Sequence, residues 1–375
     1  MSFISSSDLK HLLNPFSGEA CVSLYQATHC SFPDSMQDQI QFKNLLKVLE
    51  AKLIDHLKGR EIRSILKAFS EFESDDEFWR NRTQGFAMFY HNGHIHRFDM
   101  PRAMPNLVIV SDSFHLKPIF RILQTADRFN ILTLDRYHSE VFEATRDSIT
   151  PLHLKDMPQF RKERDSGART RVGEQHMSGS GHAVMVIHEV DDQLQDAQFF
   201  QEVDHFVERN LSSQTNLPLV LVALPEHQGT FRKISKNPHL LQQGVSTGPA
   251  SLTISELRDH AYCVIKIHQH ALIQAQLDDV ESAKAQEKGS TDLSEISRAA
   301  VAGRVATLLI DADRTIPGKI DPATGEIHTT DFDQSKSDDI LDDLMEIVFR
   351  ASGKISILPS DLMPINTGVA AIYRY

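Results

Sequence analysis

Apolar positions follow strand or helix spacing along most of the chain. Short apolar runs predict strands at 21–27, 106–110, 129–134, 140–145 and 217–223. Apolar residues three or four positions apart predict amphipathic helices. These residues are Phe42, Leu45, Leu46, Leu49, Leu53 and Leu57, then Ile62, Ile65, Leu66 and Phe69, and later Phe199, Phe200, Val203, Phe206, Val207 and Leu211. Because strands and helices alternate, we expect α/β layers.

The strongest local signal is a pair of apolar-containing runs, 85–91 and 94–98, separated by Asn92-Gly93. Asn-Gly favours a type I′ turn, because both of its residues tolerate positive φ angles. The segment therefore predicts a β-hairpin.

The C-terminal third shows a further α/β pattern. A charged helix is predicted from about Leu272 to Lys288, and another from Asp292 to Ala302. The remaining elements are strands at 305–310, 326–330, 354–358 and 368–375, and a helix around 340–349.

Composition places the chain among globular proteins, with 41% hydrophobic and 24% charged residues in 375. No apolar run reaches the roughly 20 residues that span a bilayer, and no secretion signal is visible, so we expect a cytoplasmic protein without a membrane partner. Three cysteines suit neither a disulfide framework nor a zinc motif. The net charge of −12 argues against nucleic acid covering the whole surface, and we expect no DNA partner.

Charge is unevenly distributed, and residues 161–182 form a basic segment rich in glycine and serine. The segment has no apolar stripe for burial, so we expect it to lie in solvent. One interpretation is an insertion that tolerates any polar sequence. The other is a phosphate-contacting tip, in which basic side chains supply charge and glycines allow close backbone approach. The candidate RNA-binding residues are Arg161, Lys162, Arg164, Arg169, Arg171, Gly179, Gly181 and His182.

Patterns for catalysis, metals and cofactors are weak. His91, His94 and His96 flank the predicted hairpin turn, but no further ligand is spaced to complete a zinc site. The chain contains no P-loop and no dinucleotide-binding glycine pattern. We therefore expect no metal, no cofactor and no assigned catalytic residue. The acidic run at 331–343 lacks the order of a calcium loop, and we interpret it as a solvated loop and helix N-terminus.

Segments spread over most of the chain carry a resemblance to a known family. These segments are 21–29, 38–53, 84–100, 105–149, 218–235, 303–311, 353–364 and 370–375. In this order they resemble the archaeal and eukaryotic class-1 release factor and Pelota superfamily, and more closely its bacterial archaeo-eukaryotic release factor-like branch. The resemblance implies a three-domain architecture of α+β and α/β type, with mixed sheets flanked by helices. We place the domains at 1–127, 128–274 and 275–375, the last resembling kink-turn-binding ribosomal proteins.

In release factors the middle domain carries a Gly-Gly-Gln loop before a long helix, and the glutamine promotes hydrolysis of peptidyl-tRNA. The corresponding place here is 161–182, yet Gly-Gly-Gln occurs nowhere in the chain, and neither does the codon-reading Asn-Ile-Lys-Ser motif. The resemblance thus implies a non-catalytic factor that associates with the ribosome or tRNA in rescue, dormancy or quality control. One alternative is a hydrolase that acts on peptidyl-tRNA or RNA through Gln175, His176 or His182. Another is a protein–protein adaptor without RNA contact.

Overall fold

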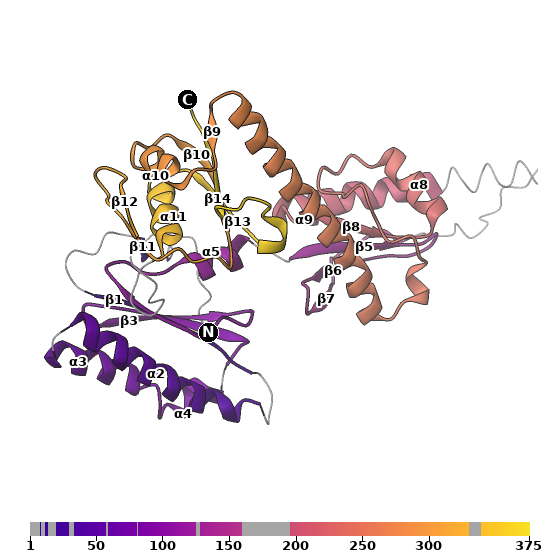
Figure 1. Cartoon of the computed structure of the whole chain (residues 1–375). Helices are drawn as coiled ribbons and strands as arrows, with labels where there is room; N and C mark the ends of the chain where they lie inside the picture. The colour runs from indigo at the N-terminus through magenta and orange to yellow at the C-terminus, as the bar shows by residue number, and fades with distance from the viewer. Residues whose placement is uncertain are drawn as a thin grey trace, which may run out of the picture. The chain divides into compact units, whose positions relative to one another are not determined.

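The computed structural model describes residues 20–29, 34–57, 59–80, 82–124, 128–159, 196–329 and 339–375, together with Asp8, Leu12 and Leu13. The chain forms two compact units, whose elements are labelled in Figure 1. Unit 1 combines Met1–Thr125 with Ala275–Tyr375, and unit 2 is Ala126–Gln274. The first and last parts of the chain therefore share one unit.

The N-terminal part of unit 1 is an antiparallel sheet with helices on one face (Figure 1). Its strands, in the order β3-β2-β1-β4, are β1 (Cys21–Ala27), β2 (Gly85–His91), β3 (His94–Met100) and β4 (Leu107–Ser111). The helices are α2 (Met36–His56), α3 (Gly59–Ser70) and α4 (Asp76–Arg80). Alternate strand side chains point to opposite faces, so Val22 and Leu24 pack with residues of α2 and α3 such as Phe42 and Phe69, whereas Tyr25 joins a second core.

The predicted hairpin is confirmed. β2 and β3 pair from Gly85 opposite Met100 to His91 opposite His94. Asn92 and Gly93 between them have φ angles of 47° and 80°. Positive φ at both turn positions is the type I′ geometry that Asn-Gly favours.

The C-terminal part of unit 1 is a mixed sheet in the order β13-β10-β14-β9. Its strands are β9 (Gly289–Ser290), β10 (Val305–Asp311), β13 (Lys354–Leu358) and β14 (Val369–Tyr373), and β10 pairs parallel with β13 and antiparallel with β14. The other elements are α10 (Leu293–Val301), the hairpin β11 (Gly318–Ile320) and β12 (Ile327–Thr329), α11 (Ile340–Arg350) and the short 3-10 helix η3 (Ser360–Leu362).

One apolar core joins the two parts of unit 1. Ile119 and Phe120 of α5 (Lys117–Gln124) belong to the same buried cluster as Leu344 and Met345 of α11. The rings of Phe120 and Phe349 meet edge to face, with centroids 5.3 Å apart. The cluster therefore contains residues that lie more than 200 positions apart in the sequence.

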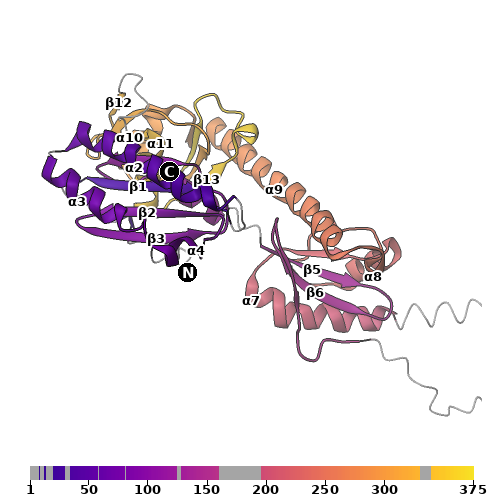
Figure 2. The same cartoon turned by 90° about the horizontal axis from the view of Figure 1, so that it is seen from below.

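Unit 2 is a mixed sheet with helices on both faces (Figure 2). Its strands, in the order β7-β6-β5-β8, are β5 (Phe129–Leu134), β6 (Ser139–Ala144), β7 (Ile149–Leu152) and β8 (Leu219–Val222). Helix 196–207 continues as the π-helix η1 (Glu208–Ser212) and α7 (Ser213–Thr215), and packs on one face with α8 (Pro225–Ile234). The 3-10 helix η2 (Pro249–Ser251) and α9 (Ile254–Ala285) follow, and Leu257 and Ala261 of α9 cover the other face.

The predicted fold class is confirmed, since α/β and α+β arrangements of mixed sheets and flanking helices build both units. Each predicted domain range carries one main sheet, whereas the first and third ranges pack in one unit. The helix predicted from Leu272 is wrong at its start, because α9 begins at Ile254. Residues 269–276 of this helix are not buried, so the apolar repeat breaks between its two buried stretches.

Within the described part of the chain, none of the helices has the length and apolar character that a membrane crossing requires.

The acidic run at 331–343 differs from its predicted solvated state. Its members outside the described residues are Asp331, Asp333 and Asp338. Asp339 caps the N-terminus of α11 as predicted, since its carboxylate accepts a hydrogen bond from the Leu341 backbone N–H. However, Asp339 and Asp342 are each only 1% exposed, so the solvated interpretation is wrong for these two residues.

Asp339 and Asp342 are buried because they bind the start of α5. The Asp342 carboxylate accepts hydrogen bonds from the backbone nitrogens of Leu116 (3.0 Å) and Lys117 (2.7 Å), and Lys117 Nζ lies 2.6 Å from Asp339 Oδ2. The first N–H groups of a helix have no partner within that helix. A carboxylate of α11 thus caps α5 from the other end of the chain.

His115 extends this network toward β1. Its backbone N–H donates to Ser23 Oγ at 3.0 Å, its carbonyl accepts a hydrogen bond from the Tyr25 hydroxyl, and its Nδ1 lies 3.4 Å from Asp342 Oδ1. Burial lowers the pKa of His115 to about 4, because an imidazolium there would lose its hydration. The ring is therefore neutral at pH 7. We call Tyr25, His115, Lys117, Asp339 and Asp342 the junction.

Candidate functional site

The RNA-binding residues predicted from the sequence all lie outside the described residues. They are Arg161, Lys162, Arg164, Arg169, Arg171, Gly179, Gly181 and His182. The described chain stops at Gln159 and resumes at Asp196, so the structure shows how the two flanks of this segment are held.

Both flanks bond to the turn between β5 and β6. Ser139 Oγ donates a hydrogen bond to the Pro158 carbonyl at 2.9 Å, and Gln159 Nε2 donates to the Ser139 carbonyl at 3.4 Å. On the other flank, Arg136 Nε lies 3.1 Å from Asp196 Oδ1. The described residues on either side of 160–195 therefore share one anchoring point. We call Arg136, Ser139, Pro158, Gln159 and Asp196 the clamp.

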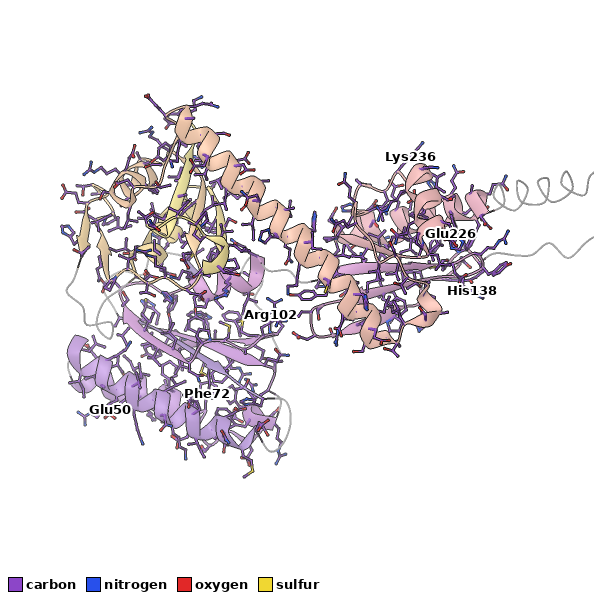
Figure 3. The ribbon with its side chains drawn as sticks, turned by 45° about the vertical axis from the view of Figure 1, so that its right-hand side comes forward. Glu50, Phe72, Arg102, His138, Glu226 and Lys236 are labelled. Atoms are coloured by element: carbon purple, nitrogen blue, oxygen red, sulfur yellow. The ribbon has the colours of Figure 1, made fainter. Side chains whose placement is uncertain are left out.

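The turn that carries the clamp is itself well defined. Asp135 Oδ1 accepts hydrogen bonds of 2.7 Å from the backbone nitrogens of both Tyr137 and His138. The His138 side chain points away from the sheet and is 72% exposed (Figure 3). β5 and β8 are parallel, so the turn after Leu134 lies at the edge formed by their carboxyl ends. This edge is where α/β sheets bind ligands most often.

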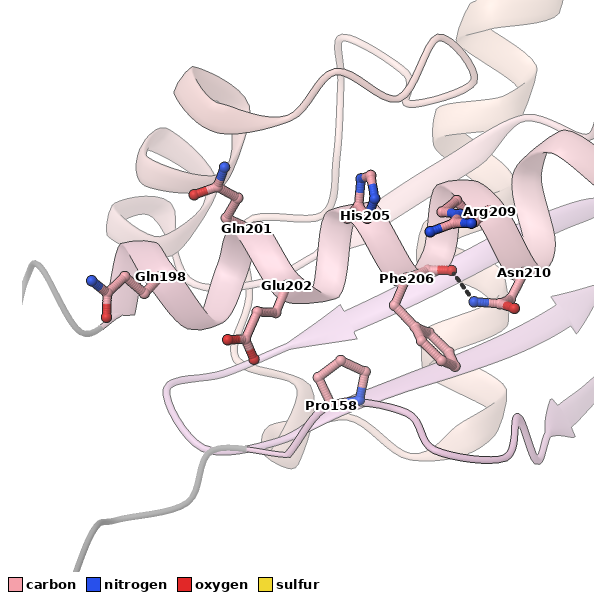
Figure 4. Close-up of a pocket in the computed structure, with 8 residues that line it drawn as sticks. All are labelled: Pro158, Gln198, Gln201, Glu202, His205, Phe206, Arg209 and Asn210. Carbon is pink, nitrogen blue, oxygen red and sulfur yellow. Dashed lines mark hydrogen bonds between the residues drawn. The ribbon is translucent and has the colours of Figure 1, made fainter.

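A groove lies beside the clamp, along the outer face of helix 196–207 and η1 (Figure 4). Its volume is about 890 Å³. Phe199, Phe200, Val203 and Val207 bury the opposite face of the helix against the sheet. The helix is therefore amphipathic, and the groove receives its polar face. The polar lining residues are Gln198, Gln201, Glu202, His205, Arg209 and Asn210, and the apolar ones are Pro158 and Phe206.

The groove spans a change of helix type. Arg209 and Asn210 belong to the π-helix Glu208–Ser212, which widens the turn by one residue. The Asn210 side chain donates from Nδ2 to the Phe206 carbonyl at 2.8 Å, as the dashed line in Figure 4 shows. Short π-helical turns are frequent at functional sites, so the irregularity singles out this part of the helix.

Most polar side chains of the groove have no protein partner among the described residues. Gln198, Gln201, Glu202, His205 and Arg209 form no hydrogen bond or ion pair with any described side chain or backbone group through their side chains. Neutral amides, a carboxylate and a guanidinium thus face one open space together. Such a set presents both donors and acceptors to a polar ligand.

The sequence analysis did not identify this groove. It predicted the helix from its apolar residues, and the same spacing places Gln201, His205 and Arg209 four residues apart on the opposite face. That row was an available signal. No signal in the sequence predicted the clamp or the π-helix. Hydrogen bonds to a distant turn and a one-residue change of helix pitch do not alter the spacing of apolar and polar residues.

The histidines around the hairpin turn are all at least partly exposed. His94 at the hairpin turn is exposed, and His91 and His96 are partly exposed. Among the residues that the structure describes, no three histidine, cysteine, aspartate or glutamate side chains are grouped so that they could hold a metal ion.

Comparison with known proteins finds a family model that matches the part of the chain containing the clamp and the groove. Residues 128–304, a little under half of the chain, match a model of archaeo-eukaryotic release factor type. The resemblance predicted from the sequence is therefore confirmed, and over this range the chain is similar to release factors. The particular family matched is bacterial archaeo-eukaryotic release factor family 3.

The solved structures found are distant. Archaeal translation termination factor aRF1 is 14% identical, with 98% of this chain and 97% of that chain covered and a TM-score of 0.25. Pelota of Archaeoglobus fulgidus is 14% identical, with 77% and 79% covered and a TM-score of 0.33. Dom34 of S. cerevisiae is 15% identical, with 75% and 72% covered and a TM-score of 0.35. No curated protein matches the sequence.

Proposed function

We propose that the protein is a non-catalytic, cytoplasmic translation factor that binds the ribosome or tRNA in rescue, dormancy or quality control. The observation that carries this proposal is the match to the release factor family over 128–304, a range that contains the basic segment 161–182. The side chains proposed to contact RNA phosphate are those of Arg161, Lys162, Arg164, Arg169 and Arg171, and Gly179, Gly181 and His182 complete the contact surface.

The sequence supports binding without hydrolysis. In the release factors that the chain resembles, a Gly-Gly-Gln triplet promotes peptidyl-tRNA hydrolysis, and the triplet is absent from this chain. Five basic side chains in 161–171 remain, against two acidic ones. Arginine and lysine contacts to phosphate give affinity and position without requiring a reactive group.

The clamp supports presentation of the segment at a fixed place. Its hydrogen bonds join Pro158 and Gln159 to Ser139, and its ion pair joins Asp196 to Arg136. A stretch of chain whose two flanking residues are anchored on one turn, as are Gln159 and Asp196, loses less conformational entropy on binding than one with free ends.

Sedimentation with ribosomes tests the proposal. The chain is mixed with ribosomes, centrifuged through sucrose at low and high salt, and compared with a variant carrying alanine at Arg161, Lys162, Arg164, Arg169 and Arg171. We expect wild-type protein in the ribosomal fraction at low salt, and about a tenfold or greater loss of binding in the variant, because each phosphate contact releases counterions.

A matched control removes the same charge elsewhere in unit 2. It carries alanine at Arg146, Lys155, Lys233, Lys236 and Lys266, which all lie outside the buried core. An equal loss of ribosome binding in both variants would show that only net charge matters, and it would overturn the role of the segment. Release of peptide from peptidyl-tRNA by the purified protein would overturn the non-catalytic part.

A further inference from the structure

We propose that the groove on helix 196–207 and η1 binds one unstacked nucleotide of a single-stranded RNA. The proposal rests on the proposed function, which supplies RNA as the partner. It places the RNA contact on described side chains outside the basic segment. Four observations carry it: two apolar walls, a row of polar side chains with Glu202 beside it, the volume of the groove, and the balance of one basic and one acidic side chain among the described lining residues.

The apolar walls suit a base. The rings of Pro158 and Phe206 lie on the same side of the helix in Figure 4, and both residues are half-buried. The backbone carbonyl of each residue accepts a hydrogen bond, that of Pro158 from Ser139 Oγ and that of Phe206 from Asn210 Nδ2. Proteins bind unpaired bases by stacking them on aromatic and apolar side chains.

The side chains of the groove form two rows with different chemistry. Gln201, His205 and Arg209 follow one another at four-residue spacing, and they point to one side of the helix axis in Figure 4. Glu202 and Phe206 lie on the other side, toward Pro158. The first row ends in a guanidinium that binds phosphate, whereas the Glu202 carboxylate accepts hydrogen bonds from exocyclic amino groups and ribose hydroxyls.

The volume and charge favour one nucleotide of a single strand over a duplex. The groove of about 890 Å³ lies within the range of small-ligand sites. A duplex is held mainly by many phosphate contacts. Among the described lining residues Arg209 is the one arginine or lysine, and Glu202 would repel a second phosphate. Base stacking with a single phosphate contact fits this balance.

Fluorescence anisotropy with labelled RNA tests the groove directly. The probes are hexaribonucleotides of a single base type and an RNA duplex of the same length, and the protein is the whole 375-residue chain. Wild-type protein is expected to bind a single strand and to bind the duplex at least fivefold more weakly. Phe206→Leu keeps an apolar side chain in the core but removes the ring, and we expect at least a fivefold loss of affinity.

Two further variants separate the roles of the rows. Arg209→Ala should weaken binding of every single strand and lower the salt slope by about one. Glu202→Gln should change the ranking of the base types, because an amide both donates and accepts. Arg146→Ala, an arginine on the β6–β7 turn and away from the groove lining, is the matched control and should leave binding unchanged.

The proposal is overturned if Phe206→Leu and Arg209→Ala bind like the wild type, if duplex binds as tightly as single strand, or if no RNA binds, as a protein occupant would predict. Failure of the groove proposal can be distinguished from failure of the proposed function. Ribosome sedimentation lost only in the five-residue segment variant, with hexamer binding absent, would retain the function and remove the groove. Hexamer binding without ribosome sedimentation would retain the groove as an RNA site and contradict the proposed function.

Discussion

The junction of unit 1 and the groove of unit 2 both gather polar side chains at helices, yet these side chains differ in their partners. In the junction, Asp342 and Lys117 are almost fully buried and each bonds to a specific protein group. In the groove, Glu202 and Arg209 are exposed and have no hydrogen-bond partner among the described residues.

This difference separates polar chemistry used for folding from polar chemistry available to a ligand. A buried carboxylate is stable only where donors satisfy it, so the junction side chains are already occupied. The groove side chains remain hydrated until something displaces that water. Substitutions in the junction should therefore lower stability and leave RNA binding by the folded protein unchanged. Substitutions in the groove should lower RNA binding and leave stability unchanged.

The largest expected effect is on the junction. Asp342→Ala removes the acceptor of two N–H groups at the start of α5, and charge-assisted hydrogen bonds contribute roughly 1.5–3 kcal/mol each. We expect unit 1 to lose about 3–5 kcal/mol of unfolding free energy. Urea unfolding followed by the fluorescence of Trp79, the one tryptophan of the chain, measures this loss.

Trp79 makes that experiment a test of cooperation within unit 1, because it lies in the N-terminal part and Asp342 in the C-terminal part. The exposed Asp279→Ala is the control, and its midpoint should match the wild type. A Trp79 transition that Asp342→Ala does not shift would show that the N-terminal sheet unfolds on its own, and the comparison would fail.

The second effect is a pH dependence. The pKa of His115 falls from its ordinary 6.5 to about 4 on folding, so between these values the unfolded chain binds a proton that the folded chain does not. Unit 1 should therefore lose stability as pH falls through this window, by about 1.4 kcal/mol per pH unit at most. Urea midpoints at several pH values should show a shallower decline in His115→Gln.

His29 provides a control of opposite sign. Its hydrogen bond to Asp38 raises its pKa, so its contribution is present at low pH and is lost as pH rises through the raised pKa. His29→Gln should steepen the decline at acid pH or leave it unchanged, because this side chain is half exposed. A His115→Gln profile parallel to that of the wild type would contradict the buried neutral imidazole.

The smallest effect concerns the clamp. Arg136→Ala removes the ion pair with Asp196, and partly exposed pairs contribute about 0.2–1 kcal/mol. We expect ribosome sedimentation to weaken by about twofold, with unit 2 still folded. Arg128→Ala breaks a comparable pair with Glu143 on the same sheet, away from the clamp, and should have no effect on sedimentation. Equal losses of ribosome sedimentation in the two variants would show that the clamp has no specific role in binding.

The sequence predicted those parts of the fold whose signal is local. Asn92-Gly93 determines the hairpin through the φ angles of its own two residues, and the apolar repeat of α2 needs only its own turns. The middle of α9 gave no such signal, because its exposed residues around Gln274 carry no repeat.

The burial of Asp342 could not be predicted for a different reason. Its partners, the backbone nitrogens of Leu116 and Lys117, lie more than 220 positions away, and backbone groups are invisible in a residue pattern. Among site residues, Arg209 was readable as part of a polar helix face, whereas its neighbour Asn210 gains its role only from the π-helix.

The salt dependence of ribosome binding tests the central claim most directly. Association constants of the wild type, the five-residue segment variant and its matched control are measured by sedimentation from about 50 to about 200 mM salt. The account predicts a steep wild-type slope that falls by several units in the segment variant, about one for each phosphate that the variant no longer neutralises, and little in the control. Equal slopes in all three proteins would contradict a segment that binds RNA phosphate.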